Sequence, residues 1–243
     1  MSTKFSNVYD DQARAEAYAT LDFPGTYYLA YRDLPAIIGQ QIHRRKALDF
    51  GCGAGRSTRF LRELGFEVVG IDISEPMLAR ARERDPQGDY RLVPDGDLGS
   101  LVANTYNLVL SVFTFDNIPT MQKKVALFQD LKRLLSAGGR IVNLVSSPEI
   151  YVNEWASFST KDFPENRVAQ CGEKVLTLML DVEDTRPVVD ILWTDEAYRD
   201  VYGRAGVRPS NVYRPLGNDR EPYSWVSETR IAPWVIYVLE RAE

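Results

Sequence analysis

Three closely spaced glycines follow a short apolar run in the segment ALDFGCGAGRST, residues 47–58. Gly51, Gly53 and Gly55 give this segment unusual backbone freedom, because glycine adopts positive φ angles and lets a ligand approach the main chain closely. A glycine-rich turn from a strand into a helix also directs backbone N–H groups and the helix dipole towards an anion. We therefore expect the turn to hold a nucleotide-like or carboxylate-bearing ligand.

The spacing of the glycines excludes two common phosphate-binding loops. A dinucleotide-binding loop needs the pattern G-x-G-x-x-G, and Arg56 stands at the place of its third glycine. A P-loop needs glycine, lysine and then serine or threonine, which this segment lacks. Asp72 ends the next apolar run, where an acid can accept hydrogen bonds from both hydroxyls of a ribose. The expected ligand thus has a ribose and a compact anionic or zwitterionic part, without a pyrophosphate.

Short apolar runs alternate with helical patterns from residue 46 to about residue 146. The expected strands are 46–50, 67–71, 90–93, 107–113 and 140–145, and the expected helices are 57–64, 75–84 and 122–135. Gly138 and Gly139 are expected to end the third helix. Continuous apolar strands between helices indicate a parallel sheet that is covered on both faces.

The alternation of strand and helix patterns ends after residue 146. We expect an antiparallel strand pair, a helix with Thr194 as its N-cap and two final strands, over 174–181, 187–193, 194–205, 207–214 and 234–240. The long polar segment between the final strands, residues 215–233, is expected to be a functional loop.

The bulk composition narrows the class of protein. The 243 residues carry a net charge of −5 and no strongly basic block, which argues against a nucleic-acid partner because phosphate binding usually requires a basic surface. Two cysteines and a single histidine, His43, exclude a disulfide scaffold and a multi-histidine site, so we expect no metal. Residues 1–20 are polar and charged, and no apolar run approaches the ~20 residues that cross a membrane. We therefore expect a cytoplasmic protein without membrane contact.

The segment ALDFGCGAGRSTRFLRELGFEVVGIDISEPMLARARE, residues 47–83, resembles motif I and the following acidic strand of class I S-adenosylmethionine (SAM)-dependent methyltransferases, and VPDGDL, residues 93–98, adds to the set. The resemblance covers residues 46–146 in its motifs and 194–240 in its fold. It implies an α/β fold with a Rossmann-like, seven-stranded, mostly parallel sheet, helices on both faces, an N-terminal helical region and an inserted lid after the fifth strand. The single methyltransferase domain, 1–243, would comprise a helical cap (1–45), a SAM-binding core (46–146), a substrate lid (147–193) and the C-terminal part of the sheet (194–243).

The resemblance implies a role for each residue around the methionine and ribose parts of SAM. Gly51 and Gly53 line the methionine part, and Gly55 is a further cofactor-binding residue of the loop. Asp49 orients the loop or binds the SAM amino group, and Asp72 binds the ribose hydroxyls. The backbone of Ser111 approaches the methionine part.

A second set of residues is expected, by the same resemblance, around the adenine. Ile73 and Met77 pack on the ring. Asp95 accepts a hydrogen bond from the exocyclic amine, and the Gly96 N–H meets a ring nitrogen. Asp97 is a rival for the role of Asp95.

The methyl acceptor is expected beyond the carboxyl ends of the strands. Segments 21–34, 113–119 and 147–167 and the loop near residues 221–234 can reach this place, and all are dense in aromatic residues. Aromatic walls with a few polar groups form pockets for flat small molecules. Phe23 and Tyr27 are aromatic candidates, and the expected substrate contacts are Tyr28, Phe115, Asn117, Tyr151, Trp155, Phe158 and Trp225.

Two charged residues are candidates for roles beside the acceptor. Methyl transfer from a sulfonium is an in-line displacement that depends on positioning, and a base is needed only where the nucleophile must lose a proton. Asp116 is the candidate catalytic base. Arg32 is expected to reach the SAM carboxylate or an acidic substrate group, since a guanidinium pairs bidentately with a carboxylate.

The sequence favours a small-molecule acceptor. FDNIP, residues 115–119, departs from the Asn/Asp-Pro-Pro-aromatic motif that base-targeting N-methyltransferases often carry after the fourth strand. DFPGTYYLAYRDLP, residues 22–35, is similar to enzymes that N-methylate azapteridine rings of the toxoflavin type. We expect a methyltransferase of secondary metabolism, a monomer or homodimer, that acts on a nitrogen or oxygen of a small aromatic or heteroaromatic metabolite.

One alternative is a protein that binds SAM but catalyses no reaction. A non-catalytic protein that binds or senses SAM would need the same Asp49, Asp72 and glycines. An NAD-dependent reductase is disfavoured by Arg56 and by the lack of a Tyr-x-x-x-Lys pair.

Overall fold

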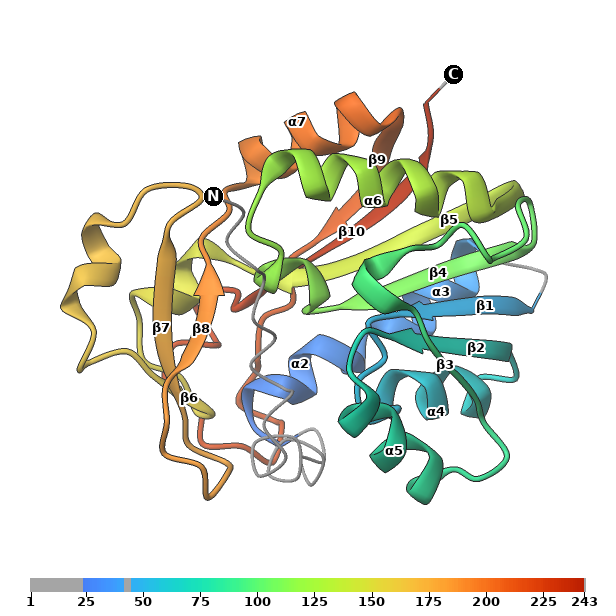
Figure 1. The fold of residues 1–243 in the computed structure, drawn as a ribbon. Coiled ribbons are helices and arrows are strands. Elements are labelled where there is room, and N and C mark those ends of the chain that lie inside the picture. The colour runs from blue at the N-terminus through green and yellow to red at the C-terminus, as the bar shows by residue number, and fades with distance from the viewer. Residues whose placement is uncertain (1–23, 42–44, 243) are drawn as a thin grey trace.

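The computed structural model of the protein describes residues 24–41 and 45–242 (Figure 1). The helices are α2 (Thr26–Arg32), α3 (Leu34–Gln41), α4 (Arg56–Glu63), α5 (Glu75–Arg84), α6 (Met121–Leu134) and α7 (Asp195–Ala205). The strands are β1 (Lys46–Phe50), β2 (Glu67–Asp72), β3 (Asp89–Leu92), β4 (Tyr106–Val112), β5 (Leu135–Ser146), β6 (Phe158–Ser159), β7 (Lys174–Met179), β8 (Val188–Ile191), β9 (Val207–Tyr213) and β10 (Trp234–Arg241). Short 3₁₀ helices are η2 (Pro94–Gly96), η3 (Thr114–Asn117), η4 (Pro148–Tyr151) and η5 (Pro164–Val168). The expectations for Phe23, for His43 and for a helical start of the chain before residue 24 lie outside the described residues.

Seven strands form one sheet in the order β3-β2-β1-β4-β5-β10-β9. The pairs from β3 to β5 are parallel, and β10 runs antiparallel to both of its neighbours, β5 and β9. The inner strands β1 and β4 are mostly buried, in agreement with their continuous apolar sequence. The expected seven-stranded, mostly parallel sheet is confirmed.

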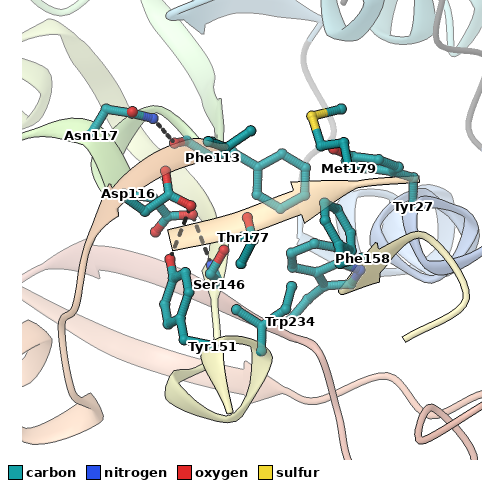
Figure 2. A pocket seen from close by; sticks show the side chains of 13 residues that line it. Tyr27, Phe113, Asp116, Asn117, Ser146, Tyr151, Phe158, Thr177, Met179 and Trp234 are labelled. Carbon is teal, nitrogen blue, oxygen red and sulfur yellow. Dashed lines mark hydrogen bonds between the residues drawn. The ribbon is translucent and has the colours of Figure 1, made fainter. Parts of the chain in front are cut away.

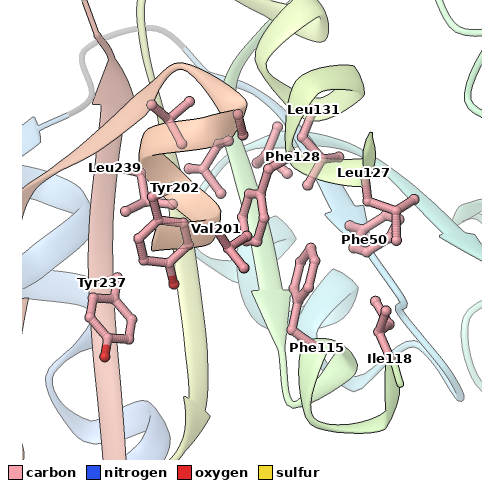
Figure 3. Close-up of a cluster of buried hydrophobic side chains, with 14 of the residues drawn as sticks. Phe50, Phe115, Ile118, Leu127, Phe128, Leu131, Val201, Tyr202, Tyr237 and Leu239 are labelled. Atoms are coloured by element: carbon pink, nitrogen blue, oxygen red, sulfur yellow. The ribbon is translucent and has the colours of Figure 1, made fainter. Parts of the chain in front are cut away.

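Helices cover both faces of this sheet, as Figure 1 shows. On one face α6 and α7 pack on alternating side chains of the strands, in a cluster that includes Phe50, Phe128, Tyr202 and Leu239 (Figure 3). On the other face α2, α3 and α4 cover the residues of opposite parity. No helix within the described ranges is long and apolar enough to cross a membrane.

The junction between α6 and β5 differs from the expectation. Gly138 and Gly139 do not end the helix, because α6 ends at Leu134 and β5 begins at Leu135. The glycines lie in an irregular stretch of the strand, where the register with β4 shifts. A Cβ at Gly139 would come within 2.9 Å of the Tyr106 carbonyl oxygen. Close pairing with β4, and not a helix end, therefore explains this glycine.

Strands β6, β7 and β8 form a second, antiparallel sheet, here called the small sheet. The expected antiparallel pair is confirmed, with somewhat shorter strands than the sequence suggests. In Figure 1 the small sheet stands beyond the carboxyl ends of the parallel strands, and η3, which follows β4, packs against β8. The small sheet therefore faces the edge at which open α/β sheets bind their ligands.

A buried carboxylate ties α2 to two distant loops. Glu228 is fully buried, and its Oε1 accepts hydrogen bonds from Thr26 Oγ1 at 2.6 Å and Ala156 N at 2.7 Å. Its Oε2 accepts from the backbone N–H groups of Val226 and Ser227 at 2.9 and 3.1 Å. Hydrogen bonds to an ionised acceptor are stronger than those between neutral groups, so this carboxylate holds the segments together.

We expect Glu228→Ala to lower the free energy of unfolding by about 2–4 kcal/mol, because it leaves three backbone N–H groups and a hydroxyl without their acceptor. Urea denaturation followed by circular dichroism measures the change. The control Asp200→Ala removes an exposed i,i+4 pair with Arg204 and should change the value by less than about 0.5 kcal/mol. Equal midpoints for the two variants would contradict the structural role of Glu228.

Candidate functional site

The turn between β1 and α4 brings the three glycines together. Gly51 and Cys52 donate their N–H groups to the Ile71 carbonyl at 2.9 and 3.0 Å, which fixes the turn over the end of β2. Gly51 has a φ of +74°, and a Cβ there would lie 2.1 Å from Thr114 Oγ1. Gly55 is the N-cap of α4, in the left-handed conformation. Glycine is therefore required for the shape of the turn itself.

Asp72 lies at the end of β2, directly beside the glycine turn. Its Oδ2 accepts a hydrogen bond from Gly53 N at 2.8 Å, and its Oδ1 accepts one from Ser74 N at 2.8 Å. The side chain of Met77 is buried, and its Cε lies 3.0 Å from the place that a Cβ on Gly53 would take. The structure therefore brings Gly53, Asp72 and Met77 together.

Asp49 is fully buried beneath the turn. Its Oδ2 accepts hydrogen bonds from Ser57 Oγ at 2.7 Å and Thr58 Oγ1 at 2.6 Å, at the start of α4. Its Oδ1, like the buried Oγ of Ser111 at the end of β4, has no hydrogen-bond partner among the described residues. Burial raises the pKa of Asp49 to about 6, and the charge of Asp72 adds to the increase. A buried acceptor without a donor is unfavourable, so Asp49 Oδ1 is a candidate contact for a ligand.

The structure describes the surroundings of some of the residues that are expected around the adenine. Ile73 is 38% exposed, which leaves a surface for contact. Gly96 belongs to η2 and has a φ of +74°. Asp97 Oδ1 accepts a hydrogen bond from Gly99 N at 2.8 Å and thereby closes its own turn. The side chain of Asp95 lies outside the described part of the structure, so its role stays a prediction.

A pocket lies between the main sheet and the small sheet (Figure 2). Its aromatic walls come from α2, the loop after β4, η4, β6 and β10, and consist of Tyr27, Phe113, Tyr151, Phe158 and Trp234. The rings of Phe113 and Trp234 have centroids 4.6 Å apart, and those of Tyr27 and Phe158 are 5.0 Å apart. The polar residues that line the pocket are Asp116, Asn117, Ser146, Thr177 and Asp190.

The loop after β4 joins this pocket to the glycine turn. Thr114 Oγ1 donates to the Phe50 carbonyl at 3.0 Å and fills the space that a Cβ on Gly51 would need. Phe113 has a φ of +60°, which is rare for a bulky residue, and its ring points into the pocket (Figure 2). A group bound in the pocket therefore lies close to the glycine turn.

Two carboxyl groups line the pocket. Asp116 accepts from Ser146 N at 3.0 Å through Oδ2 and from the Tyr198 hydroxyl at 3.4 Å through Oδ1. The Tyr151 hydroxyl donates to Asp190 Oδ2 at 3.2 Å. Burial raises the pKa of both carboxyl groups, and the negative charge of Asp116 raises the pKa of Asp190 further. Such perturbed acids in a pocket are typical of functional sites.

A buried lysine stands behind the two acids without lining the pocket. Lys124 Nζ donates to the Phe115 carbonyl and lies 4.7 Å from the ring centroid of Trp193. Burial lowers the pKa of this lysine, and the charge of Asp116 opposes the decrease. Among residues 24–41 and 45–242, no three His, Cys, Asp or Glu side chains are grouped so as to hold a metal ion.

Of the expected substrate contacts, Asn117, Tyr151 and Phe158 line the pocket together with Asp116, and four aromatic residues do not. Phe115 faces the core, where its ring stacks on Phe128 with centroids 4.1 Å apart.

The other three aromatic residues are used in packing. Trp155 is buried, and its Nε1 donates to the Ile150 carbonyl at 2.9 Å. Tyr28 and Trp225 both pack on Tyr223, with centroids 5.1 and 5.0 Å apart, in the loop before β10. None of the three lines the pocket, and their contact with a substrate stays a prediction.

Arg32 is held by carboxylates of the chain itself. Its Nη1 donates to Glu221 at 2.7 Å and to the Leu216 carbonyl at 2.9 Å, and its Nε and Nη2 donate to Asp33 at 2.8 Å each. The guanidinium thereby fastens α2 to the loop before β10, and the contact of Arg32 with a ligand carboxylate stays a prediction.

Sequence reasoning missed two residues that shape the pocket. Asp190 interrupts the apolar run VVDILW, residues 188–193. An acidic residue within an otherwise apolar strand is a sequence signal for a functional site. Trp234 begins β10, and its local sequence does not distinguish it from a core residue. Both come from elements that meet the loop after β4 only in the folded chain.

Comparison with known proteins identifies the family. A family model described as a methyltransferase domain matches residues 48–143, from β1 to β5. The cypemycin N-terminal methyltransferase of Streptomyces sp is 32% identical over 188 residues, which cover 72% of this chain and 74% of the relative. The chain spans about half the length of the first curated relatives it matches.

Two solved structures are similar in fold over most of the chain. The CcbJ methyltransferase from Streptomyces caelestis has a TM-score of 0.65 and 18% identity, over 97% of this chain and 98% of its own. The 1,6-didemethyltoxoflavin-N1-methyltransferase of Burkholderia thailandensis, with bound 1,6-didemethyltoxoflavin and S-adenosylhomocysteine, has a TM-score of 0.55 and 16% identity, over 88% and 79%. At these identities the likeness concerns the fold alone. Together with the cypemycin relative and the motifs of the glycine turn, it leads to one conclusion: the chain belongs to the class I SAM-dependent methyltransferases.

Proposed function

We propose that the chain transfers a methyl group from SAM to a nitrogen or oxygen of a small aromatic or heteroaromatic acceptor. The observation that carries the proposal is the pocket of aromatic side chains beside the glycine turn. Thr114 connects the two, because its hydroxyl bonds to Phe50 and its side chain fills the space beside Gly51. An acceptor in the pocket is thus close to a methyl donor at the turn.

The residues around the glycine turn suit SAM, which when bound supplies a methyl group on a positively charged sulfur. Asp49 Oδ1 is a buried acceptor that lacks a donor among the described residues, and the amino group of SAM carries donors. Asp72, which accepts hydrogen bonds from Gly53 N and Ser74 N beside the turn, is proposed to bind the ribose hydroxyls. Contacts to the methionine and adenine parts are proposed for Ser111, Ile73, Met77, Asp95 and Gly96.

The pocket is proposed to orient the acceptor and to exclude water from it. Tyr151 and Phe158 supply flat apolar walls, and Asn117 supplies a polar contact. Positioning of this kind can contribute roughly 7–11 kcal/mol to lowering a barrier. Asp116 is proposed to take a proton from acceptors that carry one, an effect on the order of 10²–10⁴-fold.

The setting of this activity is part of the proposal. We propose a small-molecule partner, no nucleic-acid partner and a role in secondary metabolism, carried out in the cytoplasm by a monomer or homodimer. Residues 147–193, which include the small sheet, would act as the substrate lid over the SAM-binding core 46–146. A protein that senses SAM without chemistry is the second candidate, and turnover separates it from the first.

Calorimetric titration with SAM and with S-adenosylhomocysteine tests the cofactor site. We expect Asp72→Ala to weaken binding by about 30-fold or more, because two hydrogen bonds to a charged acceptor are lost. The control Asp89→Ala removes an exposed carboxylate that pairs with Arg91 at the opposite end of the neighbouring strand, and it should leave both affinities unchanged. A folded wild-type protein that binds neither ligand would overturn the proposed function.

The pH dependence of S-adenosylhomocysteine binding tests the role of Asp49. The carboxyl group has a pKa of about 6 in the free protein, so it is neutral below that pH and charged above it. The ligand amino group stays protonated up to about pH 8. We therefore expect affinity to rise about tenfold between pH 5 and pH 7, as the carboxylate forms opposite the ammonium.

The asparagine variant provides the contrast. Asp49→Asn should bind more weakly at pH 7 and lose the rise, because the amide does not ionise in this range. Asp190→Asn, which changes an acid in the neighbouring pocket, should keep it. A rise that survives in Asp49→Asn would assign the dependence to another group.

A further inference from the structure

We propose that the methyl-accepting group is a basic nitrogen, bound as a protonated amine by the paired carboxyl groups of Asp116 and Asp190. This inference rests on the proposed function and names the chemical class of its acceptor. Asp116 comes from η3 in the core, and Asp190 comes from β8 in the small sheet. Both line the same pocket, where η3 packs against β8.

The charges that line the pocket are of one sign. Asp116 and Asp190 are its ionisable acids, and no lysine or arginine is among the described residues that line it. An acceptor that carries a carboxylate would bring a third negative group into a partly buried space, which is strongly unfavourable. A cationic acceptor compensates the charge that the fold places there.

The charge of the buried Lys124 lowers the pKa of both acids, but the lysine makes no direct ion pair with them within the described residues. Its Nζ donates to the Phe115 carbonyl and faces the ring of Trp193. Burial lowers its pKa, so the environment itself favours the neutral amine. Asp116 and Asp190 can therefore both interact with a cationic group that binds in the pocket.

The aromatic walls suit the same ligand. A cation above the face of an aromatic ring is attracted by the ring quadrupole, most strongly where water is excluded. Tyr27, Phe113, Phe158 and Trp234 surround one end of the pocket, while Asp116 and Tyr151 mark the other (Figure 2). Rings on several sides with carboxyl groups at one end form a site for an amine attached to an apolar or aromatic body.

The hydrogen bonds assign different tasks to the two acids. Each oxygen of Asp116 already accepts a bond, from Ser146 N and from the Tyr198 hydroxyl, so this carboxyl group is fixed in place. Asp190 is less buried, and Tyr151 holds one of its oxygens at 3.2 Å. For this class of acceptor Asp190, and not Asp116, is the proposed base, and the fixed carboxyl group of Asp116 orients the ammonium. The ammonium N–H bond breaks and leaves its electron pair on nitrogen, and an O–H bond forms on the Asp190 carboxylate.

Calorimetry on the complex with S-adenosylhomocysteine tests the inference at pH 7.5. The probes are benzylamine, benzyl alcohol and benzoate, which share a flat ring and differ in charge. We expect benzylamine to bind about tenfold or more tightly than benzyl alcohol, and benzoate to bind most weakly. Benzoate binding as tight as that of benzylamine would overturn the inference. Absence of S-adenosylhomocysteine binding would instead count against the proposed function.

A matched pair of variants locates the effect. Asp190→Asn should weaken benzylamine binding about tenfold or more and leave benzyl alcohol binding nearly unchanged. Asp181→Asn makes the same change on the exposed turn between β7 and β8, and it should bind both probes as the wild type does. Equal benzylamine affinity in the two variants would contradict the role of Asp190.

A measurement on the wild-type protein covers the case in which Asp190→Asn does not fold. The groups around Asp190 that titrate or carry charge are Asp116 on η3, Lys124 on α6 and Tyr151 on η4, and Tyr198 on α7 bonds to Asp116. Because the pKa values of both acids are raised, benzylamine affinity should fall about tenfold as the pH drops from 7.5 to 5, while benzyl alcohol affinity stays level. A level benzylamine affinity would overturn the proposed carboxyl pair.

Discussion

The contact between Gly51 and Thr114 is the constraint on which the site depends. The space of a missing Cβ is filled by a threonine side chain, and the Thr114 hydroxyl bonds to the Phe50 carbonyl at 3.0 Å. The same loop carries Phe113 and Asp116 into the pocket. Because Thr114 packs closely against the glycine turn, the turn and the pocket are held near each other.

The buried ionisable groups near the pocket lower the stability of the folded state. Since Asp116 and Asp190 have raised pKa values, they bind protons more readily in the folded chain than in the unfolded one, and their ionisation lowers stability as the pH rises. Burial likewise disfavours the charge on Lys124. Apolar residues of similar size would stabilise this region at least as well. Ligand chemistry is therefore the physical reason we give for ionisable groups at these positions.

The sequence predicts a helix or strand correctly where the element's own residues determine its conformation. The strand at residues 46–50 and the helix at residues 75–84 have the bounds that the apolar pattern predicts, and Thr194 accepts the capping hydrogen bond expected of it. The start of β5 is different, because Leu135 and the glycines after it resemble a helix end. Pairing with β4 decides their conformation, and that partner is distant in the sequence.

The sequence predicts which segments lie near the pocket but not which of their residues face it. A pattern without strict periodicity does not show on which side of a turn each residue lies. Within η3 and the residue before it, Phe113 and Asp116 face the pocket, while Phe115 between them stacks on Phe128 in the core. One segment can therefore contribute some residues to the pocket and others to the core. Asp190 shows the complementary case. Its strand has no place in the motif set, yet its carboxyl group becomes part of the pocket once β8 packs against η3, so the polar lining of the pocket is specified by tertiary contact.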